Sequence, residues 1–82
     1  MNTDIINAVS SETRLKMLAE IGKREICACR LPAIVKKTQP AVSQHLGVLR
    51  EADLVKSRKD GAKVLYSLTE KGKRVLSDIK RW

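Results

Sequence analysis

Two cysteines one residue apart are the side chains of this 82-residue sequence best suited to bind a ligand or to react. On a strand, Cys27 and Cys29 would point to the same face, where two thiolates could hold a soft metal ion or a metalloid. On a helix they would diverge by about 200°. Arg24 and Arg30 favour the thiolate form, which would make the pair redox-reactive. Alternatively, both cysteines are small hydrophobic residues packed beside the core.

The stretch at residues 38–52, TQPAVSQHLGVLREA, holds the other chemically informative residues. Val42, Leu46 and Leu49 recur as on one face of a helix, and Thr38 is a suitable N-cap. The outward surface near the start of this helix is neutral and carries hydrogen-bonding side chains, whereas an ordinary surface helix carries more Lys and Glu. Gln can pair with the edge of adenine, and Ser can serve several bases. The stretch therefore predicts a helix that reads base edges in DNA.

Five side chains of this predicted recognition helix are candidate DNA contacts. We assign Gln39, Ser43 and Gln44 to base edges and Arg50 to a phosphate. His45, the only histidine of the chain, lies about 60° from the centre of the apolar stripe. We interpret it chiefly as a packed, hydrogen-bonded residue and only secondarily as a DNA contact.

A basic hairpin follows this helix. Residues 54–58 and 63–68 are rich in strand-forming residues, and the Asp-Gly pair between them is typical of a hairpin turn. Arg58, Lys59 and Lys63 lie near its tip. They could merely protect a solvated strand edge, but after a recognition helix we interpret them as phosphate contacts of a wing.

The remaining segments must position these groups, and most of them are predicted to be helical. The expected helices cover residues 3–9, a segment that Ser10 or Ser11 caps and Gly22 ends, residues 31–37, and a last helix that Thr69 caps. Residues 26–29 are predicted to be extended. The expected buried residues are Leu15, Leu18 and Ala19 in the second helix and Leu31, Ile34 and Val35 in the third. The terminal helices carry apolar stripes at Ile5, Ile6 and Val9 and at Val75, Ile79 and Trp82.

Composition narrows the class of partner. The net charge of +8 and the pI of about 9.9 indicate that the partner is a polyanion, and they favour nucleic acid over a membrane surface. Aromatic residues make up only 2%, so stacking on single-stranded bases is nearly excluded and duplex DNA is favoured. Neither a signal peptide nor a membrane-spanning stretch is recognisable, so we expect a cytoplasmic protein without a constitutive structural disulfide.

The sequence offers little for catalysis. It contains no set of nucleophile, base and orienting group, no glycine-rich phosphate loop and no cluster of carboxylates. The cysteine pair also has no second Cys or His pair with which to complete a tetrahedral zinc site. We therefore predict that the chain is not an enzyme, and a thiol-disulfide redox protein is the only catalytic alternative.

The run from Ser11 to Leu68 resembles the ArsR/SmtB family of winged-helix repressors. The matching pieces, in the family's order, are SETRLKML, EICACRL, QPAVSQHLGVLREADLVKSR and KDGAKVLYSL. The resemblance implies a symmetric homodimer held by its first and last helices, which binds operator DNA, represses transcription and releases DNA when an effector binds. Because EICACRL resembles the family's metalloid-sensing segment, it also implies As(III) or another thiophilic ion at Cys27 and Cys29.

Several residues depart from the family's pattern. Pro32 stands where a third cysteine often lies, and Arg30 replaces a common acidic residue. Asp53 replaces a common Gly. The last helix has no His and, after its first turn, only the carboxylate of Asp78, so the family's zinc site on that helix is absent.

We thus predict a mainly α protein with a small β-hairpin wing, a winged helix-turn-helix in one domain over residues 1–82. The helix-turn-helix should cover about 31–52, the wing about 54–68, and the dimerisation helices about 3–9 and 69–82. The predicted function is a homodimeric repressor that releases operator DNA when arsenite, a soft metal or an oxidant acts on the two cysteines. The alternatives are the same DNA binder with structural cysteines and another effector, a thiol-disulfide redox protein, or a protein-binding winged-helix module.

Overall fold

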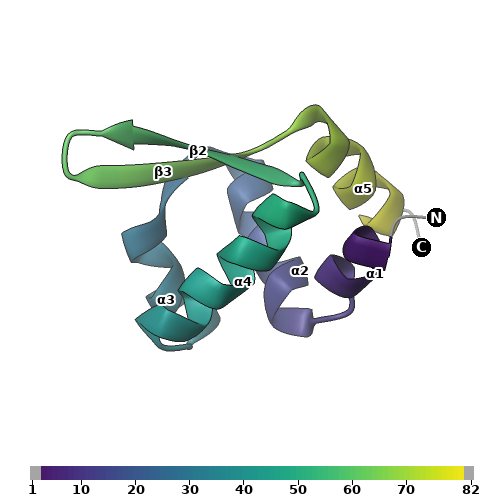
Figure 1. The fold of residues 1–82 in the computed structure, drawn as a ribbon, viewed down its shortest axis with the longest axis horizontal. Coiled ribbons are helices and arrows are strands. Elements are labelled where there is room, and N and C mark those ends of the chain that lie inside the picture. Colours follow the sequence, from purple (N-terminus) through teal and green to yellow (C-terminus); the bar gives the residue numbers. More distant parts are fainter. Residues whose placement is uncertain (1–2, 81–82) are drawn as a thin grey trace.

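The computed structural model describes residues 3–80 and confirms a mainly helical fold with a small sheet, a winged helix-turn-helix (Figure 1). The helices are α1 (Thr3–Val9), α2 (Glu12–Lys23), α3 (Leu31–Val35), α4 (Gln39–Glu51) and α5 (Glu70–Lys80). The strands are β1 (Ile26–Cys27), β2 (Val55–Asp60) and β3 (Lys63–Leu68), and a 3-10 helix covers Ala28–Arg30. Of the described helices, none is long and apolar enough to cross a membrane.

The wing is the outer part of a three-stranded antiparallel sheet with strand order β1-β3-β2. Strands β2 and β3 form the predicted hairpin, whose two-residue turn begins at Gly61 with a φ of 63°, a conformation that favours glycine. Strand β1 adds a third strand, which the sequence did not predict, by pairing Ile26 with Tyr66 and Cys27 with Leu65. The segment before the helix-turn-helix is therefore part of the wing sheet.

The prediction that residues 26–29 are extended is right for only half of that segment. The strand stops at Cys27, and Cys29 lies in the 3-10 helix. The cause is local, because Cys27 caps the 3-10 helix and its Sγ accepts a hydrogen bond from the backbone N–H of Cys29 at 3.3 Å. The two cysteines therefore do not share one face of a strand.

Helix α2 lies at the centre of the fold and packs against α1, α3, α4, α5 and β3. The predicted buried face of α2 is partly wrong. Leu18 is fully buried, but Leu15 and Ala19 are half-buried, and Met17 and Ile21 are buried instead. The prediction assumed that α2 buries only one face. Because neighbouring elements surround α2 on several sides, its most buried residues differ from those of a helix with a single buried face. In α3, Leu31 and Val35 are buried as predicted, and Ile34 is half-buried.

Gly22 does not end α2, contrary to the prediction, because the helix continues to Lys23 and Arg24 follows in an extended conformation. The glycine instead permits close packing against the last helix. A Cβ atom at this position would lie 2.7 Å from Cδ2 of Leu76, which is too close for a real contact. A small residue at this position therefore serves the contact between α2 and α5.

The terminal helices lie at the end of the molecule opposite the hairpin tip (Figure 1). Thr69 caps α5 as predicted, since its Oγ1 accepts a hydrogen bond from the N–H of Gly72 at 2.9 Å. Ile6 on α1 is half exposed, and Val75 and Ile79 on α5 are half-buried. Trp82, the last residue of the predicted stripe, lies outside the described residues.

Candidate nucleic-acid interface

Helix α4 has the anchoring that a recognition helix needs. Thr38 is its N-cap, with Oγ1 accepting from the N–H of Ala41 at 3.3 Å. Val42, Leu46 and Leu49 are exposed by 0 to 3% only, so the predicted apolar stripe is confirmed. The helix is thus fixed to the core along one face and presents the other to solvent.

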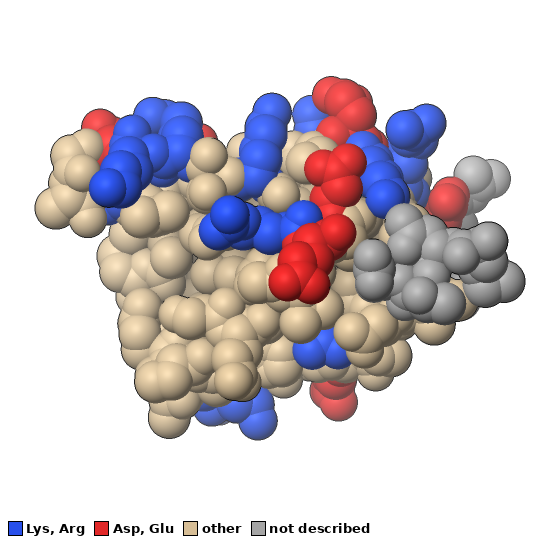
Figure 2. Space-filling view, in the orientation of Figure 1, with Lys and Arg blue, Asp and Glu red and all other residues tan. Residues whose placement is uncertain are grey.

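The exposed face of α4 carries the predicted candidates. Gln39, Ser43, Gln44 and Arg50 are all exposed. Figure 2 shows an uncharged surface over α3 and the first half of α4, whereas Lys and Arg gather over the hairpin and are mixed with Asp and Glu along the adjoining edge. Neutral hydrogen-bonding groups and positive charge are therefore on neighbouring but separate parts of one surface.

The turn between α3 and α4 adds two cations that the sequence reasoning did not name as contacts. Lys36 ends α3 in a left-handed conformation with a φ of 58°, and the N–H of Lys37 donates to the carbonyl of Pro32 at 3.1 Å. Both lysine side chains are exposed. Their position directly before the start of α4 was the signal that could have identified them as phosphate contacts.

The hairpin tip presents Lys59 and Lys63 to solvent. Lys59 is paired with Val64, and Lys63 with Asp60 on the next rung, so the two lysines project from opposite faces of the hairpin. A hairpin that carries charge on both faces can contact a DNA backbone by either face or by its edge.

Arg58, the third predicted wing contact, already has a protein partner. Its Nε and Nη2 donate to the two carboxylate oxygens of Glu25 at 2.8 and 2.7 Å, in a bidentate ion pair. These hydrogen bonds lower the pKa of the Glu25 carboxyl below its ordinary value. Sequence reasoning missed Glu25 because 33 residues separate the partners, although a lone acid before β1 was visible.

The ion pair lies beside the cysteines. Cys27, Leu65 and Arg58 occupy one rung across the three strands, and residues on one rung share a face of the sheet. The Glu25 side chain reaches from the start of β1 to Arg58 on β2, which is on the other side of β3. The cysteine segment and the wing are therefore linked both by backbone pairing and by an ion pair.

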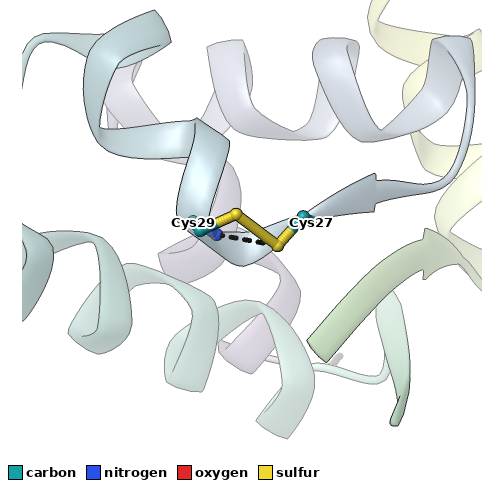
Figure 3. The surroundings of a disulfide bond; sticks show 2 residues. All are labelled: Cys27 and Cys29. Carbon is teal, nitrogen blue, oxygen red and sulfur yellow. Dashed lines mark hydrogen bonds between the residues drawn. A yellow bond between two sulfur atoms is a disulfide. The ribbon is translucent and has the colours of Figure 1, made fainter. Parts of the chain in front are cut away.

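Cys27 is buried, Cys29 is exposed, and a disulfide joins them across a Cα–Cα distance of 5.2 Å (Figure 3). From the sequence, we expected only that no constitutive structural disulfide would form. The two sulfurs meet because the 3-10 helix turns Cys29 back toward the end of β1. A link between residues only two positions apart restrains little of the unfolded chain, so this disulfide contributes little to stability.

Among the described residues, no three His, Cys, Asp or Glu side chains gather to hold a metal ion.

His45 is half-buried on the flank of α4, and its Nδ1 lies 3.0 Å from Nη1 of Arg14 on α2. Burial, followed by the positive charges of Arg14 and Lys37, lowers the pKa of His45 below its ordinary value. The contact agrees with the interpretation of His45 as a packed, hydrogen-bonded residue. Arg14 was not among the predicted site residues.

Comparisons with known proteins match most of the chain. The family described as "Bacterial regulatory protein, arsR family" matches residues 11–57. A transcriptional repressor SmtB homolog from Synechocystis sp. is 36% identical over 67 residues, which cover 82% of this chain and 51% of that protein. An arsenical resistance operon repressor from Staphylococcus aureus is 36% identical over 75 residues, covering 92% of this chain and 69% of the repressor.

A solved structure has the same fold over nearly the whole chain. Reduced HlyU from Vibrio cholerae N16961 superposes with a TM-score of 0.85 at 30% identity, covering 96% of this chain and 84% of the other. The chain spans about half the length of the SmtB homolog. The similarity therefore includes the helix-turn-helix and the wing, while the longer relative has further residues with no counterpart here.

Proposed function

The chain belongs to the arsR family of bacterial regulatory proteins, and from that premise we propose that it is a repressor that binds duplex operator DNA as a homodimer. Membership in a family of regulatory proteins confirms that the chain is not an enzyme. The observation that carries the proposal is the exposed neutral face of α4 beside a basic hairpin. A nucleic-acid role also agrees with the net charge of +8.

In the proposed complex, α4 enters the major groove and the hairpin contacts the backbone. Gln39, Ser43 and Gln44 contact base edges, and Arg50, Lys59 and Lys63 contact phosphates. Arg58 can join them only by leaving Glu25. His45 acts through packing against Arg14.

The homodimer would be held by α1 and α5. In so small a chain, apolar side chains left partly uncovered on two terminal helices favour association with a second copy. Those of the described residues are Ile5, Ile6, Val9, Val75, Leu76 and Ile79. A two-fold dimer would place its two recognition helices about one turn of DNA apart. Operator DNA as the partner also implies a cytoplasmic protein.

The proposed effector acts on Cys27 and Cys29. A thiol reductant that cleaves the disulfide supplies two electrons and leaves two thiolates, which could hold As(III) or a soft metal ion that accepts a further ligand from outside the chain. Alternatively, the pair could itself be oxidised and reduced reversibly. The similarity to a repressor named for arsenical resistance supports a metalloid as the effector. The similarity to a protein solved in its reduced form supports an oxidant as the effector. Structural cysteines with a different effector remain the alternative function.

The register of the sheet suggests how such a signal reaches DNA. Cys27 pairs with Leu65 on the central strand of the wing, so a change at the sulfurs would first displace the wing. The effector must bind the released state more tightly than the DNA-bound state. We therefore place the point of control at the wing rather than at the tilt of α4.

The test is a duplex titration with reduced, oxidised and arsenite-treated protein, on a sequence selected from a random pool. We expect either arsenite or a disulfide-forming oxidant to weaken binding. The double variant Cys27→Ser with Cys29→Ser should bind DNA normally and respond to neither treatment. If the double variant still releases DNA on both treatments, the sensing site lies elsewhere. If the wild-type chain binds no duplex, the proposal that it is a repressor is refuted.

A further inference from the structure

One guanidinium joins three helices. Arg14, in the first turn of α2, donates from Nε to the carbonyl of Ala8 at 3.0 Å and from Nη2 to the carbonyl of Asn7 at 2.8 Å. Both carbonyls belong to the last turn of α1, where a positive charge is favourable. The remaining Nη1 lies 3.0 Å from Nδ1 of His45 on α4. Arg14 thus connects the first helix of the chain to the helix that carries the base-edge candidates.

The contact with α4 depends on the protonation state of His45. A guanidinium can only donate hydrogen bonds, so Nδ1 of His45 must be an acceptor and the imidazole must be neutral, with its proton on Nε2. Protonation would place a second donor opposite Arg14 and bring two positive charges together. The bond to α4 would then be lost, while the two bonds to α1 would remain.

The charges around His45 are few. Arg14 from α2 and Lys37 from the turn before α4 are positive, and both lower the pKa of His45, after burial. Glu51 of α4 lines the same shallow recess of about 380 Å³ as Arg14 and His45. The hydrogen bonds of the described residues include none from Glu51 to Arg14 or to His45.

We propose that Arg14 is a positioning residue for DNA recognition, which holds α4 against α1 while His45 is neutral and releases it when His45 is protonated. This inference rests on the proposed function, in which α1 belongs to the dimer interface and α4 reads bases. The spacing of two recognition helices then depends on how firmly α4 is held to α1. Protonation of one side chain would therefore loosen sequence recognition.

The expected pH dependence has a definite sign. Because the folded protein favours neutral His45, protonation requires a lower pH than for an ordinary histidine, whose pKa is about 6.5. Discrimination between sequences should fall as the pH falls through the folded-state pKa of His45. The added charge would itself strengthen binding to every duplex, so absolute affinity is ambiguous. The ratio of affinities for a selected and an unrelated duplex removes that common contribution.

The experiment measures this ratio for the wild-type chain at pH 7.5 and at about pH 5, while NMR follows the single imidazole. We expect the ratio to fall by about tenfold, the effect of one lost hydrogen bond to a charged group, in step with the titration of His45. His45→Gln should bind with a ratio that no longer changes with pH, since its amide oxygen can accept from Arg14 but does not titrate. A wild-type ratio that is constant while His45 titrates would overturn the inference.

Two substitutions of Arg14 test the link without DNA. In Arg14→Gln the pKa of His45 should rise toward its ordinary value, because a nearby positive charge is removed. Arg14→Lys keeps the charge but not the three-way contact, so it should keep a lowered pKa and lose discrimination already at pH 7.5. An unchanged His45 pKa in Arg14→Gln would overturn the link even if DNA binds. A folded chain that binds no duplex at either pH would instead refute the proposed function.

Discussion

The recognition helix α4 and the β2–β3 hairpin face the same side of the molecule but are held in opposite ways. Helix α4 is fixed by three side chains exposed by no more than 3%, and the outer groups of its first half are neutral, with Arg50 and Glu51 only at its end. Strand β2 buries only its first residue and carries lysines and an arginine beyond it. Base-edge hydrogen bonds need a fixed geometry, whereas attraction to phosphates tolerates mobile charges. In the proposed complex, this difference would give sequence choice to α4 and affinity to the hairpin.

The largest loss of duplex binding is expected from a change on α5, outside α4 and the hairpin. In the proposed dimer, two copies must present α4 and the hairpin to one duplex. Ile79→Asp puts a charge on the apolar stripe of α5 and should leave a monomer or an unstable chain. Loss of the second half-site should weaken duplex binding by about a hundred- to ten-thousandfold. Sedimentation and duplex titration measure both. Ser77→Asp adds the same charge at an exposed position of α5 and should change neither. A wild-type chain that sediments as a stable monomer would contradict the dimer.

The hairpin should determine affinity without affecting sequence choice. In a dimer, Lys59→Ala with Lys63→Ala removes four charges at the hairpin tips. The slope of log K against log salt should become shallower by about four, and binding to all sequences should weaken alike. Lys23→Ala with Lys73→Ala, two exposed lysines on α2 and α5, matches the loss of charge and should leave the slope nearly unchanged. Equal slopes in the two variants would remove the hairpin from the DNA interface.

Helix α4 should show the reverse behaviour. Gln44→Ala is expected to relax discrimination by roughly 1–3 kcal/mol at one position in each half-site, because a bidentate contact to a base is lost. The salt slope should stay the same, since no charge changes. A selection from randomised operators, scored position by position, measures the loss. Gln39→Ala is the matched comparison, and it should affect a different position. An unchanged preference in both variants would mean that α4 does not read these bases.

The elements that sequence analysis located are those specified by neighbouring residues. The N-cap of Thr38 and the stripe of Val42, Leu46 and Leu49 lie within a few turns of one helix. The Asp-Gly turn likewise specifies a hairpin from adjacent residues. Local signals of this kind also identified the cap at Thr69.

The features that were missed depend on residues distant in sequence. Strand β1 has two residues, too few for a pattern, and its partner Tyr66 lies far along the chain. The Arg14–His45 contact joins residues 31 positions apart. The composition reveals many cations but not which of them have partners, so Arg58 was predicted as a wing contact without its carboxylate. The types of residue in the candidate interface could thus be predicted from the sequence. Which of its charged residues form ion pairs could be learned only from the fold.

The smallest expected effect comes from the ion pair that, among residues 3–80, joins an arginine of the hairpin to the segment before β1. Glu25→Gln removes the carboxylate that holds Arg58, an exposed ion pair whose loss should cost little stability. If Arg58 then reaches a phosphate, affinity for all duplexes should rise a few-fold and the salt slope of a dimer should steepen by up to about two. Glu20→Gln, which frees Lys23 on α2, is the control of equal charge and should give less than this. Weaker binding in Glu25→Gln would show instead that the carboxylate holds the hairpin in its binding position. The hairpin would then resemble α4 in needing a fixed geometry, and the contrast between the two regions would fail.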